Sequence, residues 1–246
     1  MSPSQPTDRE TRYLDSLPSD IERKRYATLK QSLVPIRPIV NDAHVLDFGA
    51  SYGLSAVALV EYGARQVTGV EPEEWRVAKG QELLRGAGYA DQISLIHVED
   101  TRTLPFHSSS FDLVLCNAVL EHVPQPRDAH IREMWRLLRP GGTLFINETP
   151  NKYLPWDFHT TRLWWVPWLP SRLARRYAIW RGRYQTHRDW EHSGWRGLGH
   201  YELLRAIPGG YDAEWEMSRP RHRILARLGL PSSLLDPYPV FRIVRR

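Results

Sequence analysis

The feature that most constrains this chain is a pair of apolar strands that each end in a carboxylate, with a small-residue turn after the first. Residues 45–53 read VLDFGASYG, and residues 67–72 read VTGVEP. Glycines in such a turn let the backbone approach a ligand closely, and the acid after the second strand can accept hydrogen bonds from a ribose diol. Asp47 and Glu71 therefore predict a nucleoside-binding site in an α/β fold.

The nearest alternative is a dinucleotide-binding fold, whose fingerprint places three glycines in the order G-x-G-x-x-G so that a pyrophosphate sits on a helix N-terminus. Starting from Gly49, this chain places Ser51 and Leu54 at the second and third positions. The sequence therefore departs from the dinucleotide fingerprint at two of its three glycines, which disfavours a nicotinamide or flavin cofactor.

Bulk composition sets the class of protein. A chain of 246 residues with 41% hydrophobic content can bury one α/β core with an elaboration. No apolar run approaches the roughly twenty residues that cross a bilayer, and the polar N-terminus predicts no signal peptide. The single cysteine, Cys116, excludes an intrachain disulfide and a cysteine-based metal cage. We expect a cytoplasmic protein, and no metal-binding motif is evident.

Strand-like and helix-like segments alternate along the chain, which predicts a parallel sheet wrapped by helices on both faces. Residues 1–18 are predicted to be disordered or loosely attached, and residues 19–33 to form a helix with Ser19 as its N-cap. The expected strands are 44–48, 66–70, 93–97, 111–116, 143–148, 213–217 and 240–244, and the expected core helices are 54–62, 74–84, 128–138 and 200–207.

Two further motifs complete a family pattern. Residues 99–106 read EDTRTLPF, and residues 116–123 read CNAVLEHV, with RPGG at 139–142. In this order, and together with the first two motifs, they resemble the class I S-adenosylmethionine-dependent methyltransferases with a type 11-like core. The resemblance implies a Rossmann-like, seven-stranded, mostly parallel sheet whose last two strands form an antiparallel edge hairpin. It also implies that the leading helix covers the cofactor.

The same resemblance implies S-adenosylmethionine as cofactor and S-adenosylhomocysteine as product. Asp47 would order the turn and orient the amino-acid end of the cofactor, Glu71 would accept the ribose hydroxyls, and Asp100 would accept from the adenine amino group. The chain departs from the family at Ser51, where glycine is usual. The implied cofactor-binding residues are Asp47, Gly49, Ala50, Ser51, Gly53, Glu71, Pro72, Asp100, Thr101 and Asn117.

Methyl transfer to an oxygen requires an aligned nucleophile that loses its proton, so a histidine or carboxylate near the ends of strands four and five would suit it. The candidates are His122, Glu121, Glu148 and His159, and we assign the catalytic role to His122, His159 and Glu148. His122 equally fits a packing role beneath the cofactor, and many methyltransferases act mainly by positioning without a dedicated base.

Residues 152–197 interrupt the expected passage from strand five to the next helix. They carry nine Lys and Arg against three Asp and Glu, and seven of the ten tryptophans. Residues 171–184 could form a helix with Leu173, Tyr177, Trp180 and Tyr184 on one face and arginines on the rest. Such a helix suits a membrane headgroup interface or an anionic pocket, and the alternative is that its aromatic face packs on the core.

We therefore expect four parts: residues 1–40 as tail and cofactor-covering helix, 41–151 as methyltransferase core, 152–197 as a Trp/Arg-rich lid, and 198–246 as the rest of the core sheet. The preferred function is methyl transfer to a small molecule, preferably a sugar or lipid-linked glycan hydroxyl, with peripheral membrane contact through 171–184. Two alternatives stay open: a nucleic-acid methyltransferase that grips its substrate with the insertion, and a non-catalytic relic that binds cofactor or membrane.

Overall fold

The computed structural model describes residues 6–215 and 227–246, and it divides the chain into two compact units. Unit 1 holds residues 1–115 and 136–143, and unit 2 holds residues 116–135 and 144–246. The end of the strand expected at 213–217 lies outside the described residues. Among the described residues, none of the helices combines the length and apolar character that a bilayer-spanning segment needs.

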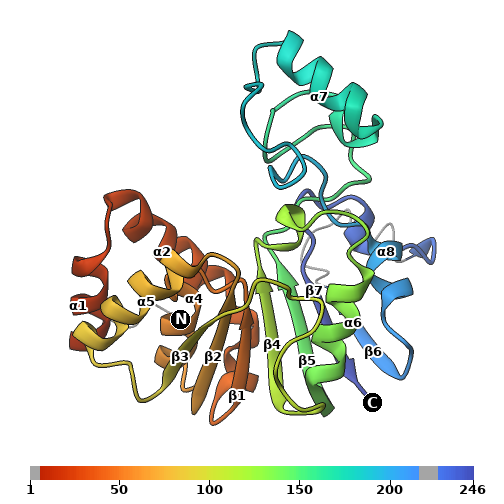
Figure 1. The fold of residues 1–246 in the computed structure, drawn as a ribbon. Coiled ribbons are helices and arrows are strands. Elements are labelled where there is room, and N and C mark those ends of the chain that lie inside the picture. Colours follow the sequence, from red (N-terminus) through yellow and green to blue (C-terminus); the bar gives the residue numbers. More distant parts are fainter. Residues whose placement is uncertain (1–5, 216–226) are drawn as a thin grey trace. The chain divides into compact units, whose positions relative to one another are not determined.

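Seven strands form one sheet in the order β3-β2-β1-β4-β5-β7-β6 (Figure 1). The strands are β1 His44–Phe48, β2 Gln66–Glu71, β3 Ile93–His97, β4 Phe111–Asn117, β5 Leu138–Asn147, β6 Tyr211–Trp215 and β7 Phe241–Arg245. The helices are α1 Asp8–Ser16, α2 Asp20–Ser32, α3 Arg37–Val40, α4 Leu54–Glu61, α5 Glu74–Ala87, α6 Asp128–Leu137, α7 Ser171–Trp180 and α8 His200–Ala206, with short 3-10 turns η1 Val34–Ile36, η2 Leu120–His122, η3 Val166–Trp168 and η4 Ser232–Leu234.

The sheet is mostly parallel, as the sequence predicts. β1 pairs in parallel with both β2 and β4, and Asp47 lies opposite Gly69 on one side and Leu115 on the other. β6 and β7 pair antiparallel, which confirms the expected edge hairpin. Because parallel strands end at the same edge of a sheet, the residues that follow β1, β2 and β4 share that edge. The Rossmann-like fold class is therefore confirmed.

Strand β5 begins earlier than predicted. We expected residues 140–142 to stop a helix and the strand to start at 143, but β5 begins at Leu138 and includes the Pro-Gly-Gly segment. Arg139 forms an ion pair with Asp112 of β4 at 2.5 Å, and a Cβ on Gly142 would lie 3.0 Å from the Asp112 carbonyl oxygen. Contact with β4 thus keeps this segment extended, because glycine permits the close approach.

Residues 8–16 form helix α1, contrary to the prediction that residues 1–18 are disordered or loosely attached. Thr7 and Glu10 form a capping box at the start of α1, in which each side chain accepts a backbone hydrogen bond from the other residue. Tyr13 is fully buried, and its hydroxyl donates to the Tyr52 carbonyl at 2.8 Å. Helix α1 is therefore held by tertiary contacts that a local reading of polar and proline residues does not reveal. The predicted Ser19 cap of α2 is confirmed.

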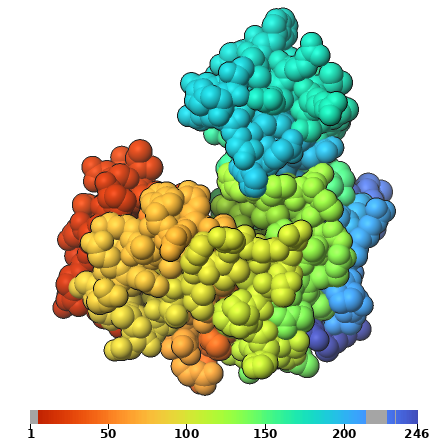
Figure 2. Space-filling model, viewed as in Figure 1, coloured from red at the N-terminus to blue at the C-terminus, as the bar shows by residue number. Residues whose placement is uncertain are grey.

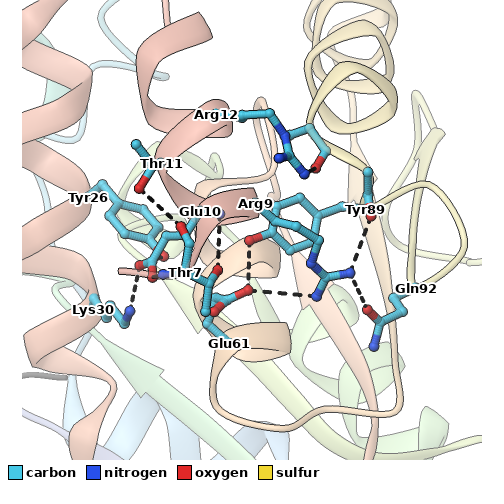
Figure 3. A network of polar contacts seen from close by, with 12 residues as sticks. Thr7, Arg9, Glu10, Thr11, Arg12, Tyr26, Lys30, Glu61, Tyr89 and Gln92 are labelled. Atoms are coloured by element: carbon cyan, nitrogen blue, oxygen red, sulfur yellow. Dashed lines mark hydrogen bonds and ion pairs between the residues drawn. The ribbon is translucent and has the colours of Figure 1, made fainter. Parts of the chain in front are cut away.

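A buried carboxylate anchors α1 to α2 (Figure 3). Glu10 is 2% exposed, and its Oε1 accepts hydrogen bonds from the Tyr26 hydroxyl at 2.6 Å and from Lys30 Nζ at 2.5 Å. Burial, together with the Glu10 carboxylate, raises the pKa of the Tyr26 hydroxyl well above its ordinary value. On the neighbouring face Arg9 donates to Gln92 at 2.9 Å and lies over the Tyr89 ring.

Replacing Glu10 with alanine should lower the free energy of unfolding of the full chain by about 2 kcal/mol, because Tyr26 and Lys30 lose a charged partner inside the unit. Asp8→Ala is the matched control, since Asp8 is an exposed acid in the first turn of the same helix. Urea denaturation followed by circular dichroism measures both variants. Equal losses in the two variants would show that the buried network does not stabilise the segment.

Candidate functional site

The turn after β1 adopts a left-handed backbone at three of its five residues. Gly49, Ser51 and Gly53 have φ angles of +83°, +50° and +92°. The N–H groups of Gly49 and Ala50 both donate to the Val70 carbonyl, at 2.9 and 3.0 Å. A left-handed conformation favours glycine, so Ser51, the departure from the family pattern, holds a conformation that is strained for a side-chain-bearing residue.

The turn seats closely against β2. A Cβ on Gly69 would lie 2.6 Å from the Ala50 Cβ, so only glycine at this position of β2 lets the turn approach. On the other side a Cβ on Gly53 would lie 3.3 Å from Leu84 of α5. The turn is thus positioned by close contacts with both neighbouring elements, and these contacts shape a backbone cradle that suits a small ligand.

Asp47 is a buried acid at the end of β1. Its side chain is 1% exposed, and its Oδ2 accepts a hydrogen bond from the Ser55 hydroxyl at 2.5 Å. Burial raises the pKa of the Asp47 carboxyl from 3.8 to about 7, the Ser55 hydrogen bond opposes this rise, and the Glu71 charge adds to it. A positively charged ligand group beside Asp47 would reverse the effect by stabilising its ionised form.

Glu71 links the ends of β1 and β2. Its Oε2 accepts from the Ser51 N–H at 3.0 Å, and its Oε1 accepts from the Glu73 N–H at 3.2 Å. A carboxylate offers about four acceptor positions, so Glu71 can accept further hydrogen bonds from a diol. Pro72 follows on the exposed side of the loop. The structure therefore brings together the predicted residues 47–53, Glu71 and Pro72.

Asp100 and Thr101 lie in the loop that follows β3. Asp100 is exposed and faces Arg102, whose Nε and Nη2 donate to its two carboxylate oxygens at 2.8 Å each. The predicted contact between Asp100 and an adenine amino group would require the carboxylate to accept one more hydrogen bond beside this fork.

Two predicted site residues of unit 2, Asn117 and Glu148, have unusual surroundings or backbone geometry. Asn117 ends β4, and its Oδ1 is buried without a hydrogen-bond partner in the described residues, which fits a ligand that donates there. Glu148 follows β5 with a φ of +56°, and burial raises the pKa of its carboxyl above the ordinary value. Strained backbone and a perturbed acid together are typical of functional sites.

Folding brings His122 and His159 together with a third candidate from the sequence analysis, Glu121. The two imidazole ring centroids are 5.0 Å apart, and His122 Nε2 lies 4.0 Å from Glu121 Oε1. The Glu121 side chain is fully buried. Burial raises the pKa of the Glu121 carboxyl, whereas His122, Thr149 and Arg127 oppose this rise.

Arg127 and three glycines hold this region, and the sequence analysis assigned no role to them. The buried Arg127 guanidinium donates to the Val123, Arg196 and Gly197 carbonyls at 2.8, 2.6 and 2.9 Å. A Cβ on Gly197 would lie 1.8 Å from the Pro150 carbonyl oxygen, and Leu198 N–H donates to that same oxygen at 2.8 Å. The two ends of the 152–197 insertion therefore meet. A Cβ on Gly194 or Gly199 would lie 2.6 or 2.3 Å from a neighbouring side chain.

Helix α7 differs from its predicted form. It ends at Trp180 instead of Tyr184, because Gly182 adopts a left-handed φ of +64° and closes the helix. Its core-facing residues are Ala174 and Ala178, which pack with Leu163, Val166, Trp190 and Trp195. Leu173 and Trp180 are 51% and 77% exposed, so the alternative in which the aromatic face packs on the core is wrong at these two residues, whereas Tyr177 and Tyr184 do pack against the cluster.

The comparisons with known proteins agree with the fold and the turn. Residues 46–146 match a family model described as a methyltransferase domain. Together with the seven-stranded sheet and the turn of residues 49–53 beside Asp47 and Glu71, this match identifies these residues as a class I S-adenosylmethionine-dependent methyltransferase domain.

Individual relatives support this identification. The ubiquinone biosynthesis O-methyltransferase of Xanthomonas campestris pv. campestris (strain B100) is 39% identical over 125 residues, which cover 49% of this chain and 50% of that protein. The protein of the same name from Coxiella burnetii (strain Dugway 5J108-111) is 34% identical over 115 residues, 45% of this chain and 47% of that protein. The chain thus matches about half the length of these curated relatives. The crystal structure of an S-adenosylmethionine dependent methyltransferase from Mesorhizobium loti shares the fold, with a TM-score of 0.52, 21% identity, and coverage of 94% of this chain and 100% of that chain.

The raised pKa of Asp47 predicts a pH-dependent stability. Between about pH 4 and pH 7 the folded chain keeps a proton on Asp47 that the unfolded chain releases. The free energy of unfolding should therefore fall as pH rises through this window, by up to about 1.4 kcal/mol per pH unit, and level off above about pH 7. Asp47→Asn should remove this component. Urea titrations at several pH values measure it, with Asp91→Asn, an exposed acid, as control. The same pH profile in Asp47→Asn and in the unmodified chain would contradict the assignment.

Proposed function

We propose that this chain transfers a methyl group from S-adenosylmethionine to an oxygen atom of a small-molecule acceptor. The observation that carries the proposal is the left-handed turn of residues 49–53 with the buried acids Asp47 and Glu71 beside it, inside the matched domain. The curated relatives are named O-methyltransferases of ubiquinone biosynthesis, which supports an oxygen atom of a small molecule as the acceptor.

The residues present fit the cofactor. When bound, S-adenosylmethionine supplies an electrophilic methyl group on a sulfonium. Ionised Asp47 would stabilise the positively charged amino-acid end, and Glu71 would accept from the ribose hydroxyls with its remaining acceptor positions. The turn backbone of Gly49, Ala50, Ser51 and Gly53, with Pro72, Asp100, Thr101 and the orphan Oδ1 of Asn117, completes the proposed binding set.

The acceptor side is proposed for the polar residues of unit 2. An attacking hydroxyl must lose its proton as it reacts, and a carboxyl whose pKa lies above the ordinary value is a better base near neutral pH. Glu148 meets this condition, since burial raises its pKa. His122 and His159 would position the acceptor oxygen from the neighbouring cluster.

The 152–197 insertion is proposed as the segment that recognises the acceptor. A chain of aromatic contacts joins Trp156, Trp164, Trp165 and Trp168, with ring centroids 5.2 to 6.3 Å apart. Of these four residues, Trp164, Trp165 and Trp168 are each more than half exposed. Figure 2 shows the surface of this segment in cyan. Large exposed aromatic faces stack on sugar rings or enter a membrane interface.

The helix that follows adds charge to this apolar surface. Leu173 and Trp180 are seven residues apart on α7, so they lie on one helix face, and Arg172 and Arg176 beside them are exposed. Tryptophan with arginine suits the headgroup layer of an anionic membrane. We therefore propose a lipid-linked acceptor, a glycan or a lipid-anchored phenol, that the protein meets at a membrane surface. Most of the net positive charge lies in this insertion, which has nine Lys and Arg against three Asp and Glu, and this argues against nucleic acid as the acceptor.

Calorimetric titration tests the cofactor assignment first. S-adenosylmethionine and S-adenosylhomocysteine should bind and NADH should not. Glu71→Ala should weaken binding about 10- to 100-fold, because the charged acceptor for the ribose diol is lost. Glu74→Ala, an exposed acid in the first turn of α5, is the matched control. Unchanged affinity in both Glu71→Ala and Asp47→Ala would overturn the assignment.

Methyl transfer from labelled S-adenosylmethionine to a panel of lipid-linked phenols, glycans and RNA then tests the acceptor. Label on the lipid-linked compounds supports the proposal, and label on RNA alone would favour the nucleic-acid alternative. Tight cofactor binding without transfer to any member of the panel would favour a non-catalytic relic.

Membrane contact is tested separately by sedimentation with phosphatidylcholine vesicles, with and without phosphatidylglycerol. Reversing both Arg172 and Arg176 to glutamate should weaken partitioning onto the anionic vesicles by about 30-fold, from roughly 1 kcal/mol per basic residue. Arg65→Glu with Arg85→Glu makes the same change in net charge at exposed positions of unit 1. Equal losses in the two double variants would show a response to net charge alone.

A further inference from the structure

Three potential metal ligands converge in unit 2. They are Glu121 and His122 from the 3-10 turn η2 and His159 from the insertion, and one ligand atom of each lies within 4.8 Å of the others. The linear sequence does not reveal this cluster, because His159 follows His122 by 37 positions in the chain. Two imidazoles and one carboxylate form a ligand set that suits zinc and other divalent first-row metals.

Hydrogen bonds outside the cluster orient two of these side chains as ligands. The Thr149 hydroxyl donates to Glu121 Oε2 at 2.8 Å, whereas Glu121 Oε1 is buried and has no hydrogen-bond partner in the described residues. His122 Nδ1 lies 2.8 Å from the His192 carbonyl oxygen. Because a carbonyl only accepts, Nδ1 must carry the proton, and in the neutral ring Nε2 keeps its lone pair. Ligand histidines in proteins are usually held in this way.

The third side chain, His159, lies in a loop that the buried Asp157 carboxylate stabilises. The buried Asp157 carboxylate accepts from the backbone N–H groups of His159, Thr160 and Thr161 at 2.7 to 3.0 Å, and from the Thr161 hydroxyl at 2.6 Å. Gly194 leaves room beside the cluster. A Cβ there would lie 2.9 Å from His159 Nε2 and 3.2 Å from Glu121 Cγ.

We infer that Glu121, His122 and His159 bind a divalent transition-metal ion, with zinc the best match to the ligand set. At zinc–ligand distances of about 2.0 to 2.1 Å, neighbouring tetrahedral ligand atoms lie about 3.3 Å apart. The ligand atoms here lie within 4.8 Å, and Glu121 Oε1 and His122 Nε2 are 4.0 Å apart, so small side-chain rotations of about 1 Å would close the site. Buried Glu121 Oε1 would then gain the partner that it lacks.

Three protein ligands leave at least one coordination position open, as in catalytic rather than structural metal sites. An acceptor hydroxyl at that position would release its proton more readily, since a bound divalent ion stabilises the alkoxide or phenoxide form. This role rests on the proposed function. The metal site itself does not, because its test measures binding of the ion in the absence of cofactor and acceptor.

The test uses the full chain without an affinity tag, stripped with a chelator and titrated calorimetrically with ZnCl2. Binding of one Zn²⁺ per chain is expected, and Co²⁺ in its place should give a visible absorption band from nitrogen and oxygen ligands. His159→Ala and Glu121→Gln should each weaken Zn²⁺ binding by more than about tenfold. Thr149→Val should weaken it by about 10- to 100-fold, because it removes only the hydrogen bond that orients Glu121.

His187→Ala is the matched control, since His187 is an exposed histidine of the same unit, and its affinity for Zn²⁺ should equal that of the unmodified chain. The inference is overturned if no Zn²⁺ binds, or if the affinity in His159→Ala and Glu121→Gln is unchanged. Urea midpoints show that each variant folds. S-adenosylmethionine titrations on the same samples report on unit 1, so failure of the metal site and failure of the proposed function give different results.

Discussion

The carboxylate of Glu71 ties the turn after β1 to the loop after β2, and the architecture of unit 1 depends on this link. One oxygen accepts from Ser51 within the left-handed turn, and the other accepts from Glu73 at the start of α5. Gly69 permits the close seat of the turn against β2. A buried acid that accepts two backbone hydrogen bonds is costly to remove, because both donors would be left unsatisfied. The same acid also presents free acceptor positions, so structure and ligand binding share one side chain.

In unit 2 the buried guanidinium of Arg127 links separate backbone segments, as the Glu71 carboxylate does in unit 1. Arg127 donates to one backbone carbonyl before the insertion and to two at its end, so residues 123 and 196–197 are fixed to one guanidinium. Burial lowers the pKa of Arg127, and Glu202 provides the opposing charge. Both ends of the insertion are therefore held close together at this place.

Most core elements could be predicted from the sequence, because their signals are local. Residues 44–48 and 93–97 have the predicted strand bounds, and Ser19 caps its helix as its side chain chemistry requires. Helix α1 could not be predicted in the same way. Its polar sequence is stabilised by Tyr13 and by the buried Glu10 carboxylate, whose partners lie on another helix. The early start of β5 likewise depends on Arg139 meeting Asp112 across the sheet.

The sequence by itself determined the turn chemistry, the order of strands and helices, and therefore the methyltransferase class of the domain, since each of these follows from residues that are neighbours in the chain. It did not determine which faces of α7 are exposed, because Ala174 and Ala178 are the α7 residues buried in the cluster with Trp190 and Trp195, while Leu173 and Trp180 are exposed. Nor did it reveal the Glu121, His122 and His159 cluster. That cluster, with its supports at Thr149 and His192, joins segments that are distant in sequence, and only the closure of the insertion brings them within reach of one ion.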